Sequence, residues 1–409
     1  MSITEPTSYW QQTTQAMGVL TDLPTWADYV VVGGGYLGAS TCYWLSRAGV
    51  NVVLLERIAP AYGATGRNGG FLTIGPVEAY PQAIQRLGHK TARDVLQVTM
   101  ESRSLVRQAL MEEGIACDYR ETGTLALALN ANQQHAFAQS QVALAADGVV
   151  TQLLNHQQVQ ELIATPLSPE IIGGLLTPET ALVHPARLVQ GILTVAQHRG
   201  ARIVNATVQR LASAENAVRV HTSRGTIQTQ QVVVATNAWM TDLLPQLEQV
   251  VVPVRGQVLS YMPLPPIFRS GMGVDVTGTG EYWQQALDGS IILGGCRSVA
   301  PHQDVGVREM QPTREVQQPL EGVLPRLFPS LAGLRVAQRW AGLMAFTPDY
   351  LPIADRVPGM KGVWVVGGFS GHGMPFGMRL GQLLAESLLR NVASDALLPF
   401  HLARPTLQR

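Results

Sequence analysis

The apolar residues of the chain gather early into two short runs without a charged residue, 29–32 and 52–55. Runs of this length and composition predict strands that are buried on both faces. The segment 39–48, which lies between them and follows a cluster of glycines, predicts a helix. The order strand, glycine turn, helix, strand predicts an α/β fold.

Patterns of both periods follow in the next part of the chain. Apolar residues recur at helical spacing over 84–110, and leucines alternate with other residues over 119–129, as in a half-buried strand that could begin a second sheet. A short helix is predicted over 156–163. Glycines and prolines within 173–185 predict a turn-rich crossing between domains.

Strand patterns predominate in the second half of the chain. The apolar runs at 232–237 and 363–366 resemble the first strand, and the later one leads through a glycine loop into a helix over 379–389. We assign the strands predicted within 253–295 to a second sheet. The other predictions for this half are a helix over 187–196, a strand over 202–208 and a polar hairpin around 218–226.

The glycines after the first strand have the spacing G-x-G-x-x-G at Gly33, Gly35 and Gly38, and Glu56 ends the second strand. Gly33 permits a tight turn, Gly35 lets the backbone approach a pyrophosphate, and Gly38 lets the helix pack closely on the strand. The helix N-terminus favours phosphates, and a carboxylate at Glu56 accepts hydrogen bonds from an adenosine ribose. Together these features predict a dinucleotide site rather than a merely structural turn.

Composition narrows the class of protein. A chain of 409 residues is too long for one compact core, so two interleaved domains are expected, and 46% apolar residues exclude a disordered protein. Lys+Arg and Asp+Glu balance at 29 each without a basic cluster, so no nucleic-acid partner is expected. The cysteines fit no disulfide or metal pattern, no apolar run is long enough to span a membrane, and residues 1–26 lack a secretory signal. We expect a cytoplasmic protein that acts on a small molecule.

Two further glycine loops are GATGRNGG at 63–70 and GGFSGHGMPFG at 367–377. Taken alone, glycines at this density fit a flexible loop as well as a close approach to a ligand. Together with the first motif, Glu56 and VVVATNAW at 232–239, these loops resemble the FAD-dependent D-amino-acid oxidase superfamily over roughly residues 27–390. GATGRNGG is most similar to the gamma-glutamylputrescine oxidase branch of this superfamily, which also includes glycine oxidases.

The resemblance implies a fold and a division into domains. We expect an α/β protein with a discontinuous Rossmann-like FAD-binding domain and a second, α+β substrate domain whose mostly antiparallel sheet roofs the flavin. The expected division is 1–26 as an N-terminal arm, 27–114, 181–248 and 335–395 as the FAD-binding domain, 115–180 and 249–334 as the substrate-binding domain, and 396–409 as a C-terminal tail.

The resemblance also implies which residues surround FAD. Contacts with its adenine-dinucleotide part are implied for Gly33, Gly35, Tyr36, Leu37, Gly38, Glu56, Arg57, Val208 and Thr236. Contacts with the pyrophosphate and the flavin are implied for Ala64, Thr65, Arg67, Asn68, Gly69 and Gly70. The residues that would face the isoalloxazine ring are Gly342, Gly371, His372, Gly373 and Met374.

The implied reaction is hydride transfer from the carbon that bears an amine to flavin N5, after which the imine is hydrolysed to a carbonyl compound. Relatives that attach flavin covalently use a late cysteine or an early histidine, whereas the last cysteine here is Cys296 and the first histidine is His89. Noncovalent FAD is therefore expected. The lysine that activates oxygen in the sarcosine oxidase branch has no counterpart, since Lys90 and Lys361 both lie outside the predicted substrate sheet. The sequence therefore leaves the electron acceptor open between O2 and another acceptor.

Three alternative functions remain open. The first is a D-amino-acid or N-methyl-amino-acid dehydrogenase that passes electrons to a quinone or a protein. The second is an NAD-binding Rossmann protein without flavin, which would not need the two later glycine loops. The third is a flavin-binding protein with a structural or tRNA-modifying role, and the lack of a basic patch argues against its tRNA version.

The way in which the substrate is held also has two alternatives. A substrate carboxylate would call for an arginine fork, although a structural ion pair is the simpler role for each of the candidates Arg255, Arg297 and Arg339. A polyamine-like substrate would instead need acids and aromatics such as Glu281, Tyr282 and Trp283.

Four residues are the candidates for catalytic roles. His372 lies within a glycine loop, which favours a flavin-side role over a structural one. Trp340 fits a pocket wall and a packed core equally well. Arg297 and Tyr282 complete the set, each through one of the two ways of holding a substrate.

Overall fold

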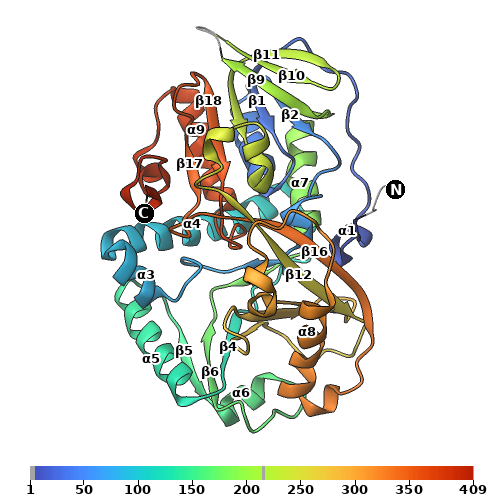
Figure 1. The fold of residues 1–409 in the computed structure, drawn as a ribbon, viewed down its shortest axis with the longest axis vertical. Helices are drawn as coiled ribbons and strands as arrows, with labels where there is room; N and C mark the ends of the chain where they lie inside the picture. The colour runs from blue at the N-terminus through green and yellow to red at the C-terminus, as the bar shows by residue number, and fades with distance from the viewer. Residues whose placement is uncertain (1–4, 214–216, 409) are drawn as a thin grey trace.

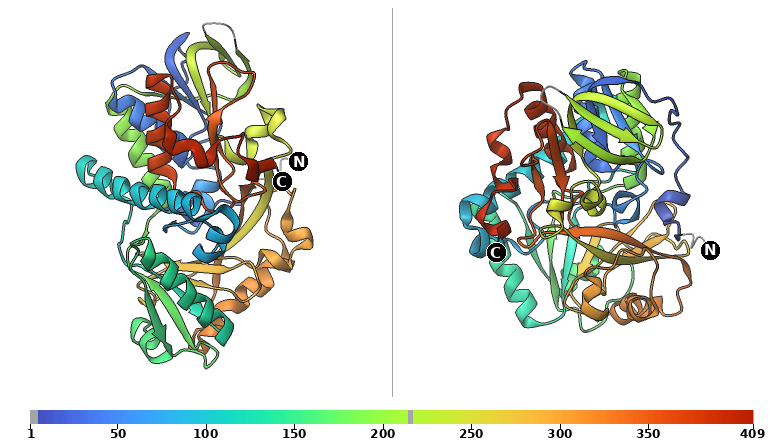
Figure 2. Two further views of the ribbon diagram at one scale, coloured as in Figure 1. Left: turned by 90° about the vertical axis from the view of Figure 1, so that its left-hand side faces the viewer. Right: turned by 45° about the horizontal axis from the view of Figure 1, so that its top comes forward.

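The computed structural model describes residues 5–213 and 217–408. Two eight-stranded sheets stand one above the other in Figure 1, and a two-stranded ribbon, β3 (Phe71–Leu72) with β7 (Ala181–Leu182), accompanies them. The long helix α4 (His89–Glu113) crosses the molecule between the two halves (Figure 2). The α/β fold with a second, mostly antiparallel sheet is confirmed.

The first sheet has a parallel centre. Its order is β17-β18-β11-β1-β2-β8, with parallel pairs from β18 to β8, an antiparallel β17 at one edge, and an antiparallel extension from β11 through β10 to β9. The strands of this sheet are β1 (Trp26–Val32), β2 (Val52–Glu56), β8 (Arg202–Asn205), β9 (Val208–Ser213), β10 (Val218–Thr222), β11 (Gly225–Val234), β17 (Ile353–Arg356) and β18 (Val363–Gly367).

Three helices cover one face of this sheet. They are α2 (Tyr36–Arg47), α7 (Pro185–His198) and α9 (Gly377–Arg390), and α2 contacts both of the others. Their apolar side chains share one buried cluster with β1 and β2. The helix predicted over 39–48 therefore exists, but it begins three residues earlier, at the glycine turn.

The second sheet has the order β16-β12-β15-β14-β13-β4-β6-β5, and every pair except β13 with β4 is antiparallel. Helix α8 (Arg314–Leu327) packs Leu320 and Leu324 into the apolar cluster of this sheet. The strands are β4 (Thr124–Ala128), β5 (Gln152–Asn155), β6 (Gly173–Thr177), β12 (Val252–Tyr261), β13 (Gly271–Val274), β14 (Glu281–Gln285), β15 (Ile291–Gly294) and β16 (Val336–Phe346).

Several local predictions were wrong or incomplete. Residues Gly173–Thr177 are not part of a turn-rich crossing but form β6, paired on both sides. The helical pattern over 84–110 belongs to two helices, α3 (Tyr80–Leu87) and α4, which Gly88 separates at φ +80°. The strand predicted over 202–208 is divided between β8 and β9. Helices α5 (Ala131–Ala146) and α8 were missed, whereas α6 (His156–Leu162) lies where it was predicted.

Strand β16 (Val336–Phe346) does not lie in the sheet to which the expected domain division assigned it. It opens the segment 335–395, which we had assigned to the FAD-binding domain, yet it pairs antiparallel with β12 from Val336 to Phe346. It therefore belongs to the second sheet. The chain crosses from this sheet to the first one after β16, and β16 and β12 run across the middle of the molecule between the two halves (Figure 1).

The start of the N-terminal arm is packed into the molecule at residues 8–10, whereas most of the arm after it is partly or fully exposed. Helix α1 (Tyr9–Gln12) begins with a capping box at Ser8, and Trp10 is only 1% exposed. Trp10 stacks edge-on against His184 with ring centroids 4.9 Å apart, and its Nε1 donates to the carbonyl oxygen of Asn68 at 2.6 Å. The arm thus reaches from the start of α7 to the 63–70 loop. Residues 1–4 lie outside the described residues.

His184 connects this arm to helix α7. Its Nδ1 accepts a hydrogen bond from the N–H of Arg187 at 3.3 Å and so caps the helix, while Nε2 lies 2.9 Å from Thr13 Oγ1. The cap requires an unprotonated Nδ1, because a proton there would face another donor. Burial and the neighbouring charge of Arg187 lower the pKa of His184 to about 4.

The pKa of His184 predicts acid sensitivity of the fold. Below its ordinary pKa of 6.5 the unfolded chain takes up a proton that the folded protein refuses until about pH 4, so the free energy of unfolding falls as the pH drops through this window. The loss amounts to roughly 3 kcal/mol. In His184→Asn the amide oxygen keeps the cap and the titration is gone. Urea unfolding between pH 7 and pH 4 should show a shallower decline for the variant, and equal slopes would contradict this account.

Candidate active site

A cavity of about 580 Å³ is lined by residues of both sheets. Val32, Glu56 and Val366, at or near the carboxyl ends of β1, β2 and β18 of the first sheet, line it. From the second sheet it receives residues of β4, β6, β12, β13, β14 and β16. The carboxyl ends of parallel strands are where α/β folds bind ligands.

The glycine turn after β1 forms one end of this cavity. A Cβ at Gly38 would lie 1.9 Å from the carbonyl oxygen of Gly33, so Gly38 serves the packing of α2 on the turn and does not line the cavity. Gly33 itself has φ +107°. A Cβ at Gly35 would meet only Thr65 Oγ1, at 3.4 Å, so its open side faces the cavity. Tyr36 and Leu37 follow in the lining.

Glu56 lies beside this turn with both oxygens ordered by backbone donors. The N–H of Gly34 donates to Oε2 at 2.7 Å and the N–H of Ile58 donates to Oε1 at 2.8 Å. Burial raises the pKa of Glu56, and these two donors oppose the rise. Nearby, the hydroxyl of Thr236 is buried and has no hydrogen-bond partner among the described residues, as expected of a group that awaits a ligand.

Arg57 and Trp239 close the cavity at the same end. The Arg57 guanidinium lies 4.8 Å from the centroid of the Trp239 ring, a cation–π contact, and both residues line the cavity with Val208. No role was predicted for Trp239, the last residue of the VVVATNAW segment. An aromatic residue directly after a predicted ligand-binding strand end was the signal that could have identified Trp239.

The 63–70 loop contains a 3-10 helix, Ala64–Arg67, and lines the middle of the cavity, with only Gly66 of its residues outside the lining. The Arg67 guanidinium is bound to the backbone, since Nη1 donates to the carbonyl oxygens of Pro6 at 2.8 Å and Ala341 at 2.9 Å. Trp340 is completely buried, and its Nε1 donates to the carbonyl oxygen of Arg67 at 2.9 Å. Trp340 is therefore a support of the loop, and its proposed catalytic role is not compatible with this position.

Tyr282 from β14 forms a wall of the cavity. Its ring occupies the space that a side chain at Gly69 or Gly294 would need, since a Cβ there would lie 2.7 Å and 2.4 Å from Tyr282 atoms. Burial raises the pKa of Tyr282 to about 12, so the phenol stays neutral. Two positions further along the strand, Gln284 Nε2 donates to the carbonyl oxygen of Gly69.

The last glycine loop contributes Gly371, His372, Gly373 and Met374 to the lining, opposite Gly342 of β16. His372 Nε2 lies 3.2 Å from the carbonyl oxygen of Gly75. Burial lowers the pKa of His372 to about 4, so the imidazole is neutral at neutral pH. The loop is fixed at its start by Ser370, which has φ +50° and whose N–H donates to the carbonyl oxygen of Ala345 at 2.7 Å.

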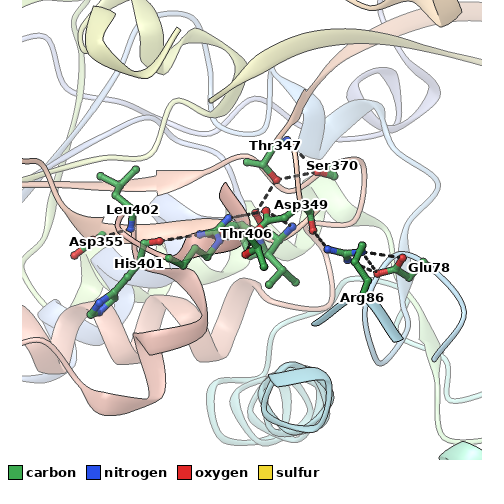
Figure 3. A network of polar contacts seen from close by, with 12 residues as sticks. Glu78, Arg86, Thr347, Asp349, Asp355, Ser370, His401, Leu402 and Thr406 are labelled. Atoms are coloured by element: carbon green, nitrogen blue, oxygen red, sulfur yellow. Dashed lines mark hydrogen bonds and ion pairs between the residues drawn. The ribbon is translucent and has the colours of Figure 1, made fainter. Parts of the chain in front are cut away.

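A buried polar network secures this loop from outside (Figure 3). Arg404 binds both oxygens of Asp349, at 2.6 and 2.9 Å, and Thr406 donates to the same carboxylate at 2.6 Å. Burial alone would raise the pKa of Asp349, but the hydrogen bonds and charge of Arg404 lower it. Thr347 lies within hydrogen-bonding distance of Ser370. Residues from the C-terminal tail thus position the loop that carries His372.

Arg297 lies outside the cavity, contrary to its proposed catalytic role. Its guanidinium stacks 5.1 Å above the ring of Phe346 and donates to Gln303. Further residues that were not predicted also line the cavity, and seven of the nine lie on strands of the second sheet; they are Phe71, Thr73, Thr124, Ala126, Leu175, Thr177, Gly256, Met272 and Met344. The alternation within these strands gives two faces but does not tell which face meets a ligand.

Comparisons with known proteins show the family of the chain. A family model described as FAD dependent oxidoreductase, DAO, matches residues 28–387. The chain is 28% identical over 373 residues to gamma-glutamylputrescine oxidoreductase of Escherichia coli, covering 88% of this chain and 83% of that protein. It is 28% identical over 374 residues to glycine oxidase of Pseudomonas aeruginosa, covering 87% and 93%.

Solved structures share the fold. The glycine oxidase from Geobacillus kaustophilus aligns with a TM-score of 0.80 at 20% identity, covering 93% of this chain and 99% of that one. The L-proline dehydrogenase from P. horikoshii aligns with a TM-score of 0.79 at 23% identity, covering 91% and 96%. Among the residues that the structure describes, no helix has the length and apolar character needed to cross a membrane.

The open side of Gly35 predicts a selective effect on the cofactor. In Gly35→Val the protein has room for the added Cβ, because only Thr65 Oγ1 lies within 4 Å of it, and we expect the two methyl groups to extend into the cavity. We expect about 10- to 100-fold weaker FAD binding, since overpacking costs roughly 1–3 kcal/mol. Flavin absorbance after gel filtration measures retention. Gly18→Val, at a position with open space, is the control, and full FAD content in Gly35→Val would refute the assignment.

Proposed function

The chain belongs to the DAO family of FAD-dependent oxidoreductases, which act on amines or amino acids, and from this membership we propose that it oxidises a C–N bond with noncovalently bound FAD. The observation that carries the proposal is a single cavity. It is lined by the glycine turn, the 63–70 loop and the His372 loop, and it continues to a wall of uncharged side chains on the second sheet.

The residues of the cavity fit an adenine dinucleotide. Gly35 leaves room for a pyrophosphate at the N-terminus of α2, Glu56 lies where a ribose is expected, and the unpartnered hydroxyl of Thr236 offers a further contact. We propose that the residues after β2, from Ala64 to Gly70 with the exception of Gly66, lie along the pyrophosphate and flavin. Gly342 and Gly371–Met374 would then face the ring.

When bound, FAD supplies the acceptor for a hydride from the carbon that bears the nitrogen, which leaves an imine that water hydrolyses to a carbonyl compound. The chain's own contribution is a weakly polar pocket. Burial disfavours an ammonium and so lowers the pKa of a bound amine, which leaves the nitrogen lone pair free. His372 is neutral at neutral pH and therefore adds no positive charge beside the nitrogen.

The printed names of the relatives support the substrate class. A gamma-glutamylputrescine oxidoreductase and a glycine oxidase both act on compounds with a C–N bond, although the two compounds differ in size and charge. What they have in common is the amine. We therefore propose that the substrate of this chain also contains an amine. The alternative within the same class is a D-amino-acid or N-methyl-amino-acid dehydrogenase.

An anaerobic titration tests the proposal. Purified protein is mixed with amines, D- and L-amino acids, N-methyl amino acids and gamma-glutamylated polyamines, and the flavin absorbance is recorded. Bleaching by one class is the expected result, and the rate of recovery after air is admitted distinguishes an oxidase from a dehydrogenase. If flavin is present and none of these compounds bleaches it, the proposed function is wrong.

The mode of flavin attachment has its own test. Unfolding the yellow protein in acid or guanidinium should release all flavin into the filtrate of a size-exclusion filter, because we propose that no bond joins FAD to the chain. Colour that stays with the unfolded polypeptide would indicate a covalent link and contradict the proposal.

A further inference from the structure

The substrate end of the cavity has a character that narrows the substrate class further. Resting on the function proposed above, we propose that the substrate is an amine whose reacting carbon carries no carboxylate, and that Met344 on β16 is a determinant of this preference. The positions of the arginines, the chemistry of the pocket wall and the space around Met344 support this preference.

The three arginines considered for a carboxylate all have other partners. Arg255 forms a bidentate, buried pair with Asp304 at 2.8 and 2.9 Å. Arg339 binds Glu321 at 2.7 Å and Gln317 at 3.0 Å. Arg297 stacks on Phe346 and donates to Gln303.

The arginines of the cavity itself are also engaged. Arg57 lies over Trp239 at the end where Glu56 is found, and the Arg67 guanidinium binds backbone carbonyls. The Arg67 donors Nε and Nη1 are thus already taken, and Arg57 lies beside Trp239 and Glu56 rather than beside His372.

The wall that the second sheet contributes to the cavity is built from uncharged side chains. Thr124 of β4 and Thr177 of β6 are direct partners across the strands, and Met272 and Tyr282 come from the neighbouring β13 and β14. The phenol of Tyr282 and the imidazole of His372 both stay neutral at neutral pH. An ionised carboxylate transferred into this pocket would lose its hydration without gaining a cation, which is strongly unfavourable. A neutral amine with uncharged substituents meets no such cost.

Met344 lies in the cavity wall beside the loop that carries His372. It lines the cavity on β16, and a Cβ at Gly256 or Gly371 would each come within 3.1 Å of its Cε or Sδ. The two glycines therefore leave the space in which the thioether lies, between β12 and the loop that carries His372. Arginine has an unbranched stem like methionine and is longer, so we expect the guanidinium of Met344→Arg to reach into the pocket.

A binding experiment without turnover tests the inference. Isothermal calorimetry on the FAD-loaded protein compares benzoate with benzamide, which has the same shape and no charge. We expect the wild type to bind benzoate no more tightly than benzamide. In Met344→Arg, benzoate should bind about 10- to 100-fold more tightly because a charge-assisted pair is gained, while benzamide is unchanged. Met344→Leu, which keeps the size and adds no charge, should show no gain.

Two results of this experiment would overturn the inference. The first is a wild type that binds benzoate more tightly than benzamide, and loss of that preference in Arg297→Gln would show that Arg297 moves to serve the pocket. The second is a Met344→Arg protein with wild-type FAD content that gains no affinity for benzoate. The gain in Met344→Arg decides the case even where the wild type binds neither probe.

A substrate pair separates this inference from the proposed function. Norvaline is butylamine with a carboxylate on the reacting carbon, so anaerobic flavin reduction by butylamine and by each enantiomer of norvaline isolates that one group. Faster reduction by the amine supports the inference. Equal or faster reduction by norvaline overturns it and leaves C–N oxidation intact. If no amine or amino acid reduces the flavin, the proposed function fails, and the calorimetric comparison alone decides whether the pocket rejects carboxylates.

Discussion

Four consecutive carbonyl groups, from Gly66 to Gly69, are each held by a side chain from another part of the chain. The donors are Ser8 and Trp10 of the N-terminal arm, Trp340 of β16 and Gln284 of β14. A segment rich in glycine has a large conformational entropy to lose, and buried carbonyls without donors would be costly, so these four contacts fix the loop on the side away from the cavity. These contacts therefore connect the N-terminal arm and the second sheet to the 63–70 loop, and they leave the side of the loop that lines the cavity free.

Close packing of two helices brings the first and last glycine motifs together. Helices α2 and α9 cross where α9 has glycines at positions 377 and 381, four residues apart and so on one face. A Cβ at Gly377 would lie 2.0 Å from the Tyr36 ring, and one at Gly381 would lie 2.4 Å from Ser40 Oγ. This contact brings the start of α9, and with it the His372 loop, beside the start of α2. Motifs that are more than 300 residues apart in the sequence thereby border one cavity.

Local patterns were sufficient for the elements whose causes are local. The strand, glycine turn, helix and strand from β1 to β2 were predictable because the turn chemistry and the apolar runs agree. Helix α8 was not, since it contains Pro319 and Pro325, which argue against a helix, and only its packing on the second sheet compensates for them. The glycines of β6 imitate a turn in the sequence. A Cβ at Gly173 or Gly174 would lie 2.4 Å or 2.6 Å from a neighbouring strand's carbonyl oxygen, so close strand approach is the actual reason for them.

For the site, sequence motifs and resemblance indicated the residues near the glycines, whereas the wall of the second sheet depends on which strand face turns inward. That wall is also where the physical properties of the cavity change. Glu56, Arg57 and Asp242 give charge to one end, while the other end keeps His372 neutral with a pKa of about 4 and Tyr282 neutral with a pKa of about 12. The same low polarity acts on a ligand, since it lowers the pKa of an amine and penalises a carboxylate. In the proposed reaction, the low polarity of the pocket would therefore have two effects. It would favour the unprotonated form of the reacting nitrogen, and it would select against substrates that carry a carboxylate on the reacting carbon.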